Sequence, residues 1–163
     1  MLRAGNVGDA VLGPAPGFVL RVDGVELTRD ELRSRVEAAA GGLRELGVDR
    51  GTMVSLGAGN SLAWITAYLA AMHLGAVLHS FNPTYKADEF EFYMSDVKAR
   101  ALVVEQGSTS PAVAVAQKLG ISIVTLHPEH DKGAGLFRLS ATKNRYFGPE
   151  VVPTGRVTFV VTV

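Results

Sequence analysis

The clearest pattern in the chain is an apolar stripe of helical period that begins shortly after residue 28. Its apolar members recur every three or four positions: Leu32, Val36, Ala39, Leu43 and Leu46. This spacing is typical of an amphipathic helix with one face against a core. Thr28 and Glu31 have capping-box spacing, in which a hydroxyl and a carboxylate satisfy free N–H groups of the first turn. Gly47 is suited to end the helix, so the pattern predicts a helix between Thr28 and Gly47.

The stretch from Leu62 to Leu74 is apolar at almost every position. A helix that is apolar on all sides is buried on all sides. This helix is too short to cross a bilayer, which takes about 20 residues. Asn60 and Ser61 supply N-cap oxygens before it, and Gly75 can end it in the left-handed conformation. The segment Ala76 to Phe81 then predicts a short buried strand. We therefore expect a buried helix and strand at the centre of the domain.

Strands and helices alternate along the chain as far as residue 126. Apolar or β-branched runs predict strands at Phe18–Val22, Val25–Leu27, Thr52–Leu56, Ala101–Glu105 and Ile121–Leu126. Helical patterns cover Lys86–Asp96 and Ser110–Leu119, and the Asp23-Gly24 pair indicates a hairpin between the first two strands. This alternation predicts an α/β fold, a layered and mostly parallel sheet with helices on both faces.

Four segments follow from the change of pattern along the chain. Residues 1–17 are rich in Gly, Pro and Ala and are expected to form a mobile leader, while residues 18–126 form the α/β subdomain. Periodicity fades over residues 127–156, where we expect a loop-rich segment with a short strand at Leu136–Leu139. Residues 157–163, VTFVVTV, predict a terminal strand whose composition favours aggregation at an unpaired edge.

Composition excludes several classes of function. The 163 residues carry 16 basic and 16 acidic side chains, so no net field favours nucleic acid or an anionic membrane. Cysteine is absent, which excludes disulfides, a cysteine nucleophile and thiolate metal sites. The N-terminus lacks the continuous apolar region of a secretory signal, and the C-terminus lacks a peroxisomal tripeptide. We expect a cytoplasmic or peroxisomal protein without a membrane span.

A glycine-containing turn is the main candidate for ligand binding. Gly57, Gly59, Asn60 and Ser61 lie between a predicted strand and a predicted helix, as in the dinucleotide fingerprint, where glycines let a pyrophosphate approach a helix N-terminus. Leu62 stands where the third glycine of that pattern belongs, and no acidic residue closes the next strand. The turn is therefore interpreted first as an ordinary capped turn, with nucleotide binding as the alternative.

Other polar and aromatic residues are assigned structural roles. His127 and His130 flank a Pro-Glu pair that resembles a metal cluster, but a third ligand is missing and we expect no metal site. His73 and His79 lie on apolar segments and are expected to be core or boundary residues. The aromatic residues Tyr85, Phe90, Phe92 and Tyr93 are expected to be core rather than a ligand cleft. The hydroxyls of Thr28, Ser61 and Ser110 are expected to cap helices rather than act as nucleophiles.

Three stretches carry a resemblance to a known family, the AMP-forming acyl-CoA synthetases of the adenylate-forming ligase superfamily. They read LTRDELRSRVEAAAGGLRELGVDRGTMVSL, NSLAWITAYLAAMHLGAVLHSFNPTY and KADEFEFYMSDVKARALVVE, and together they cover about Val25 to Glu105. The order and spacing resemble the N-terminal part of those enzymes. The wording NPTYKADEFEFYMSD is most similar to the oxalyl-CoA synthetase, or peroxisomal CoA synthetase, branch near the coumarate ligases. Two residues depart from the family pattern. Lys86 stands where the family often has Thr before the acidic turn, and Gly59 stands where it often has Pro.

The resemblance implies a reaction in which a carboxylic acid, such as oxalate, attacks ATP to give an acyl-adenylate, and CoA then displaces AMP. Magnesium accompanies the ATP. The family's phosphate loop, magnesium-binding glutamate, ribose-binding aspartate and catalytic lysine have no counterpart in these 163 residues, and the loop is expected directly after Val163. We therefore expect no catalytic, cofactor or metal residue here, and a truncated N-terminal portion of a ligase that is inactive by itself.

Two alternatives remain open. The chain is a non-catalytic interaction module that pairs with a full-length or complementary ligase chain or with itself, because truncation exposes sheet edges and apolar faces. Otherwise it is a small nucleotide-binding protein that uses the turn from Gly57 to Ser61.

Overall fold

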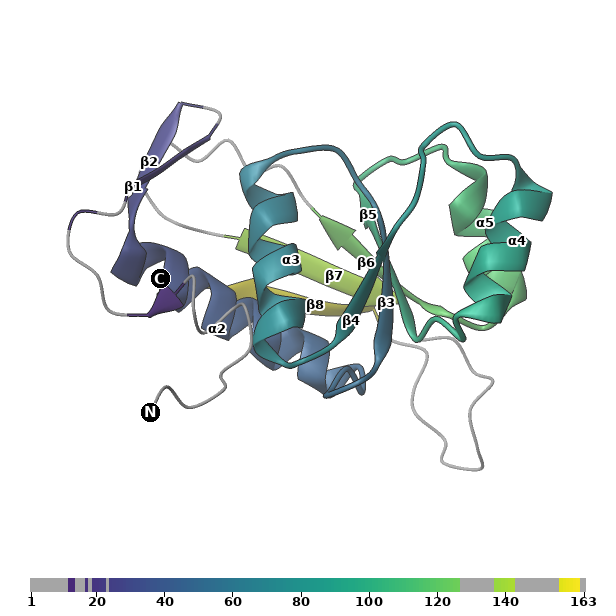
Figure 1. Cartoon of the computed structure of the whole chain (residues 1–163), viewed down its shortest axis with the longest axis horizontal. Coiled ribbons are helices and arrows are strands. Elements are labelled where there is room, and N and C mark those ends of the chain that lie inside the picture. The colour runs from purple at the N-terminus through teal and green to yellow at the C-terminus, as the bar shows by residue number, and fades with distance from the viewer. Residues whose placement is uncertain are drawn as a thin grey trace.

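The structure is a computed structural model that describes residues 12–13, 17, 19–22, 24–126, 137–142 and 156–161. In this part of the chain the helices are α2 (Arg29–Glu45), α3 (Leu62–His73), α4 (Ala87–Asp96) and α5 (Pro111–Lys118). The strands are β1 (Val19–Val22), β2 (Val25–Thr28), β3 (Met53–Gly57), β4 (Val77–Ser80), β5 (Ala101–Glu105), β6 (Ser122–Leu126), β7 (Phe137–Thr142) and β8 (Arg156–Val161). Figure 1 shows their arrangement.

The main sheet has the strand order β4-β3-β5-β6-β7-β8. Strands β4, β3, β5 and β6 run parallel to their neighbours, whereas β7 pairs antiparallel with β6 and β8 antiparallel with β7. Strands β1 and β2 form a separate antiparallel hairpin, as the Asp-Gly pair predicts. The predicted α/β fold with a mostly parallel sheet is therefore confirmed, and the antiparallel end of the sheet is an addition.

The chain after residue 126 contains more strand than expected. The short strand predicted at Leu136–Leu139 is observed as the six-residue β7, Phe137–Thr142. Its register places Leu126 of β6 opposite Leu139, which continues the sheet beyond the parallel strands. The terminal strand is observed as β8, Arg156–Val161.

Helices cover both faces of the sheet because successive side chains of a buried strand point to opposite faces. On β5, Val103 packs in the core cluster beneath α2 and α3, while Leu102 and Val104 pack in the cluster beneath α4 and α5. Figure 1 shows the two helix pairs on opposite sides of the strands. The expectation of helices on both faces is therefore confirmed.

The expected leader contains two residues that α2 holds in place. Leu12 is buried and belongs to the core cluster beneath α2 and α3. Its carbonyl oxygen accepts a hydrogen bond from Arg33 Nε at 3.1 Å, and the Gly13 carbonyl accepts one from Arg29 Nη1 at 2.5 Å. The other leader residues, apart from the exposed Gly17, lie outside the described residues.

Both ends of α2 have the predicted chemistry. Thr28 Oγ1 accepts the Glu31 N–H at 3.3 Å, and Glu31 Oε2 accepts the Thr28 N–H at 2.7 Å, which completes the capping box. Gly47 has φ +79°, and Gly75 after α3 has φ +74°. In this left-handed region glycine avoids the steric cost that a Cβ would add, so both glycines end their helices as predicted.

The capping carboxylate gives a prediction about pH. The pKa of Glu31 lies below its ordinary value of 4.5, because the Thr28 backbone N–H, the Thr28 hydroxyl and the Arg35 charge favour the ionised form. A lowered folded-state pKa stabilises the protein above pH 4.5 and loses this effect as pH falls through the folded-state pKa. We expect the stability gap between wild type and Glu31→Gln, measured by urea unfolding, to shrink on acidification through this range. Glu37→Gln, on the exposed face of the same helix, controls for the loss of one charge; an equal pH trend in both variants would contradict the assignment.

Helix α3 is less buried than its composition predicts. One side is enclosed, with Ala67, Ala70 and Ala71 almost fully buried against α2 and the sheet. On the other side the large apolar residues are only half-buried: Trp64, Ile65, Tyr68 and Met72. The Trp64 and Tyr68 rings stack on each other with centroids 5.1 Å apart. The expectation of burial on nearly every side is therefore met only in part: these four residues form a half-exposed α3 face, although Trp64, Ile65 and Tyr68 also pack against the core cluster.

Candidate functional site

The carboxyl ends of the parallel strands meet at one edge of the sheet, where ligands bind in many α/β proteins. Strand β3 is followed in the chain by β4, its neighbour on one side, and then by β5, its neighbour on the other. The strand order therefore reverses at β3, and the crevice beyond the ends of β3 and β5 is the usual ligand position in such a sheet. The turn from Gly57 to Ser61 lies at this switch point, and so does Glu105, the last residue of β5.

One backbone N–H group of the switch-point turn and one of the first turn of α3 have side-chain acceptors. Gly59 N–H donates to Glu105 Oε1 at 3.0 Å. Trp64 N–H donates to Ser61 Oγ at 3.1 Å, so Ser61 is the N-cap of α3 as predicted. Asn60 is exposed and Gly57 is half-buried. The four candidate residues are thus neighbours in one turn, and the Gly59 N–H of this turn is bound to Glu105.

The position of Glu105 decides what the turn can bind. Its exposed carboxylate accepts the N–H of Gly59, which lies two residues before Ser61, the N-cap of α3. A phosphate at this position would meet a carboxylate of like charge and would have to displace it from the Gly59 N–H. A Cβ on Gly59 would also lie 3.1 Å from Glu105 Oε1. Because glycine has no side chain, position 59 leaves room for the Glu105 carboxylate.

Sequence reasoning missed Glu105 because the bond joins residues 46 positions apart. A signal was present nevertheless. Glu105 is the only acidic residue in the predicted strand Ala101–Glu105, and it stands at the carboxyl end of that strand. A strand-order argument that placed β5 beside β3 would have brought Glu105 to the turn.

The bond between Gly59 and Glu105 gives a second prediction. We expect Glu105→Ala to lower the free energy of unfolding by about 0.5–1.5 kcal/mol, the usual contribution of such a hydrogen bond. Glu105→Gln, which keeps an amide oxygen as acceptor, should recover most of this loss. Gly59→Ala should cost less beside Glu105→Ala than in wild type, because the added Cβ lies 3.1 Å from Glu105 Oε1 and the carboxylate has to shift. Urea unfolding of wild type, Gly59→Ala, Glu105→Ala and the double variant forms a double-mutant cycle. Additive effects of the two substitutions would contradict the contact.

The turn after β4 is held by its own side chains. Asn82 Oδ1 accepts the Thr84 N–H at 3.0 Å and the Thr84 hydroxyl at 2.8 Å. Tyr85 then stacks on Tyr93 of α4 with ring centroids 5.3 Å apart. The Tyr93 hydroxyl, together with burial and the charge of Glu89, raises the pKa of Tyr85 above its ordinary value of 10.0. Tyr85 therefore stays protonated at neutral pH and contributes no base.

The aromatic residues assigned to the core differ in exposure. Phe90 is fully buried and contacts the rings of Phe81 and Tyr85. Tyr85 and Tyr93 are half-buried, whereas Phe92 is 64% exposed. The expectation of a core position is confirmed for Phe90 and wrong for Phe92.

The remaining polar candidates have the structural roles expected of them. Thr28 and Ser61 cap helices as described above, and Ser110 Oγ accepts the Ala112 N–H at 3.3 Å at the start of α5. His73 and His79 are half-buried boundary residues. His127 and His130 lie outside the described residues, so the expectation about a metal cluster there stays a prediction.

Lys86 occupies the N-cap of α4, as its departure from the family wording implies. Its side chain does not cap the helix. Instead, its backbone N–H donates to Glu89 Oε2 at 2.8 Å. Glu89 in the first turn of α4 therefore satisfies the backbone N–H of Lys86, although Lys86 has no side-chain oxygen with which to cap the helix.

Among the described residues, no three His, Asp or Glu side chains gather in one place. No helix in the described ranges is long and apolar enough to cross a membrane.

Comparison with known families gives a match over most of the chain. Residues 13–152 match the family described as AMP-binding enzyme. A probable CoA ligase of Humulus lupulus, CCL9, is 36% identical over 118 residues, which are 72% of this chain and 22% of that protein. The oxalate–CoA ligase of Arabidopsis thaliana is 35% identical over 100 residues, 61% of this chain and 20% of that protein. The chain thus spans about a fifth of the length of these relatives.

Solved structures support the same fold. ATP-bound MatB from Rhodopseudomonas palustris superposes with a TM-score of 0.67 and 22% identity, over 76% of this chain and 25% of that one. The predicted resemblance to the N-terminal part of acyl-CoA synthetases is confirmed by this fold and by the family match. The chain belongs to the AMP-binding enzyme family.

Proposed function

We propose that these 163 residues form the N-terminal α/β portion of an AMP-forming acid–CoA ligase and do not catalyse the reaction by themselves. The parent reaction joins a carboxylate, with oxalate as the first candidate, to CoA at the expense of ATP, and releases AMP and diphosphate. The family match and the likeness to two CoA ligases over about a fifth of their length support this proposal.

The observation that carries the inactive part of the proposal is the contact between Glu105 and Gly59. Adenylyl transfer needs positioned cations and backbone donors around the phosphates. At the switch point the Glu105 carboxylate takes the Gly59 N–H, a donor that a phosphate could otherwise use. No acidic or histidine cluster among the described residues supplies a metal site in its place.

The direct test is an AMP-release assay with ATP, magnesium, CoA and oxalate or other carboxylic acids. We expect no turnover above a protein-free control, while a full-length acid–CoA ligase in the same assay releases AMP. Sustained AMP release by the purified 163-residue chain would overturn the proposal.

A thermal-shift measurement tests the nucleotide-binding alternative. We expect no shift with millimolar ATP, AMP or NAD, because Glu105 occupies the turn from Gly57 to Ser61. Glu105→Ala is the informative variant, since it frees the Gly59 N–H without touching the glycines. Suppose that one of these nucleotides raises the melting temperature of wild type, and that the increase is equal or smaller in Glu105→Ala. That result would favour the small nucleotide-binding protein.

A second candidate function is that of an interaction module, and the half-exposed α3 face favours it. Trp64, Ile65, Tyr68 and Met72 form an apolar strip that the described chain covers only in part. Strand β4 also ends the sheet, with Val77 46% exposed. Such surfaces suit a complementary ligase chain or a second copy of this chain.

Size-exclusion chromatography with light scattering tests self-association. A dimer in wild type that becomes a monomer with Tyr68→Lys, but not with Ser34→Lys on the exposed side of α2, would support the module. A monomer that binds no hydrophobic dye would contradict it. The cytoplasmic or peroxisomal compartment stays a prediction.

A further inference from the structure

Two buried polar atoms on adjacent strands have no hydrogen-bond partner among the described residues. They are the hydroxyl oxygen of Ser55 on β3 and the Nδ1 atom of His79 on β4. Ser55 is completely buried and His79 is half-buried. Buried polar side-chain atoms in folded proteins almost always have a partner, which is either protein or ordered water. Both atoms therefore need an explanation.

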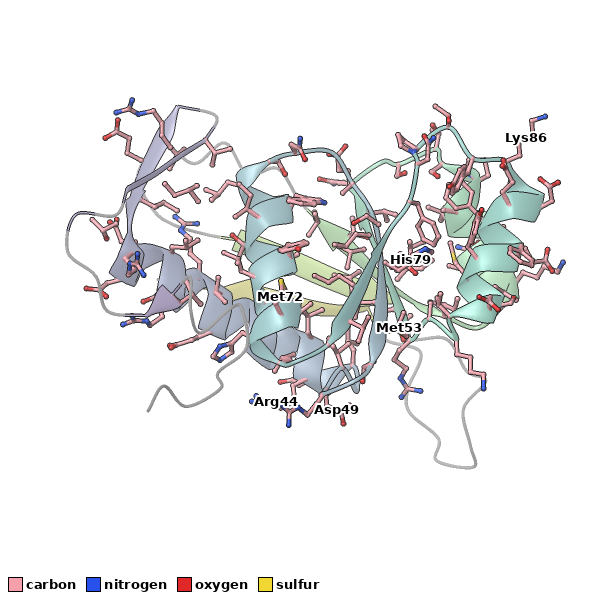
Figure 2. All side chains as sticks on the ribbon, viewed as in Figure 1. Arg44, Asp49, Met53, Met72, His79 and Lys86 are labelled. Carbon is pink, nitrogen blue, oxygen red and sulfur yellow. The ribbon has the colours of Figure 1, made fainter. Side chains whose placement is uncertain are left out.

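The sheet places these two residues next to each other. Ser55 and His79 are register partners on parallel strands, which lie about 4.8 Å apart. Register partners on neighbouring strands project toward the same face. That face carries α4, because Leu102, the partner of Ser55 on β5, packs in the core cluster beneath α4 and α5. Figure 2 shows His79 on this side of the sheet, between the strands and α4.

The surroundings of the pair are apolar and aromatic. The His79 ring contacts Phe81 edge-on with centroids 4.6 Å apart, and the Tyr93 ring lies 6.0 Å away. Leu102, on the far side of Ser55, is fully buried. Serine is the smallest side chain in the row that His79, Ser55 and Leu102 form across the sheet. Polar atoms in such an enclosure cannot reach bulk solvent.

A direct bond between Ser55 and His79 is not formed, so a third group has to satisfy both atoms. Water suits this role because it donates and accepts, and it can therefore pair with a hydroxyl and with Nδ1 in either tautomer. Buried waters usually make two to four hydrogen bonds to protein atoms that are otherwise unsatisfied. An anion or a metal ion would lack the charged partners that it needs in this apolar setting.

We propose that Ser55 and His79 together bind one buried, long-lived water molecule that links β3 to the edge strand β4 beneath α4. This site is independent of the ligase proposal, because it lies in the middle of the strands and away from the switch-point turn.

The test is a count of long-lived waters by oxygen-17 magnetic relaxation dispersion on the 163-residue chain. We expect Ser55→Ala to lose one such water relative to wild type and His79→Phe to lose one. The double variant should also lose one rather than two, because the two side chains share it. Ser122→Ala is the matched control: Ser122 is 9% exposed on β6 and its row faces α2 and α3, so its count should not change.

A measurement on the wild-type protein tests for the same water even if a variant does not fold. Water-to-protein nuclear Overhauser effects should reach the Ser55 backbone amide and the His79 ring with the sign of a slowly exchanging water. Absence of these effects, an unchanged count in Ser55→Ala, or a loss of two waters in the double variant would each overturn the proposal.

Discussion

Replacing Phe90 by alanine is expected to lower the free energy of unfolding by about 3–5 kcal/mol, the usual cost of truncating a buried phenylalanine. Phe90 is 1% exposed and is among the largest fully buried side chains of the core. Its ring meets Phe81 edge-on with centroids 5.2 Å apart and Tyr85 with centroids 5.8 Å apart. The substitution removes the apolar area, leaves a cavity, and breaks aromatic contacts that join α4 to the sheet.

The same helix supplies the control. Phe92 lies two positions later and is 64% exposed, so Phe92→Ala should change stability by less than about 0.5 kcal/mol. Both variants can be followed by urea unfolding with the fluorescence of Trp64, the single tryptophan of the chain. Equal losses for the two variants would contradict the orientation of α4.

Features that depend on neighbours in the sequence could be predicted well. The capping box of Thr28 and Glu31, the N-cap at Ser61 and the glycine ends of α2 and α3 involve atoms within about one helical turn. Residue type and spacing are sufficient there, because the partner of each free N–H group is only a few residues away. The parallel sheet could be predicted for the same reason, because each strand and each helix has its own hydrophobic period in the sequence.

Features that depend on distant partners could not be predicted in this way. Strand β7 alternates apolar and polar residues over only six positions, and its place in the sheet depends on β6 on one side and β8 on the other. Glu105 lies 46 residues from the glycine that it contacts. The Ser55 and His79 pair becomes visible only when the register of β3 and β4 is known. Each of these facts needs strand order, which the local pattern does not contain.

The half-exposed α3 face shows another limit of composition. Hydrophobicity tells which side chains favour burial, but not which neighbours are present to bury them. On α3 the small residues Ala67, Ala70 and Ala71 take the enclosed side, and Trp64 and Tyr68 take the other. Small residues allow α2 and α3 to approach closely, and the aromatic rings remain at the boundary, available to a further protein surface.

The unequal sides of α3 lead to the second large effect, for Ala70→Asp. Ala70 is fully buried in the core cluster that α2, α3 and the sheet share. A carboxylate there has no cation or donor prepared for it, and burial of an unpaired charge is among the most destabilising changes that a core can receive. We expect a loss of about 4–5 kcal/mol or more. Because domains are stable by only about 5–15 kcal/mol, this variant should be largely unfolded by circular dichroism at 37 °C.

The matched substitution is Ala63→Asp in the first turn of the same helix. Ala63 is half-buried, so its carboxylate can reach solvent, and its position near the positive end of the helix dipole stabilises an anion. We expect Ala63→Asp to change stability by about 1 kcal/mol or less. If the two variants lost the same stability, the first turn of α3 would be as enclosed as the region around Ala70. If Ala70→Asp alone unfolds the protein, the enclosure is deepest where the shared core cluster surrounds Ala70.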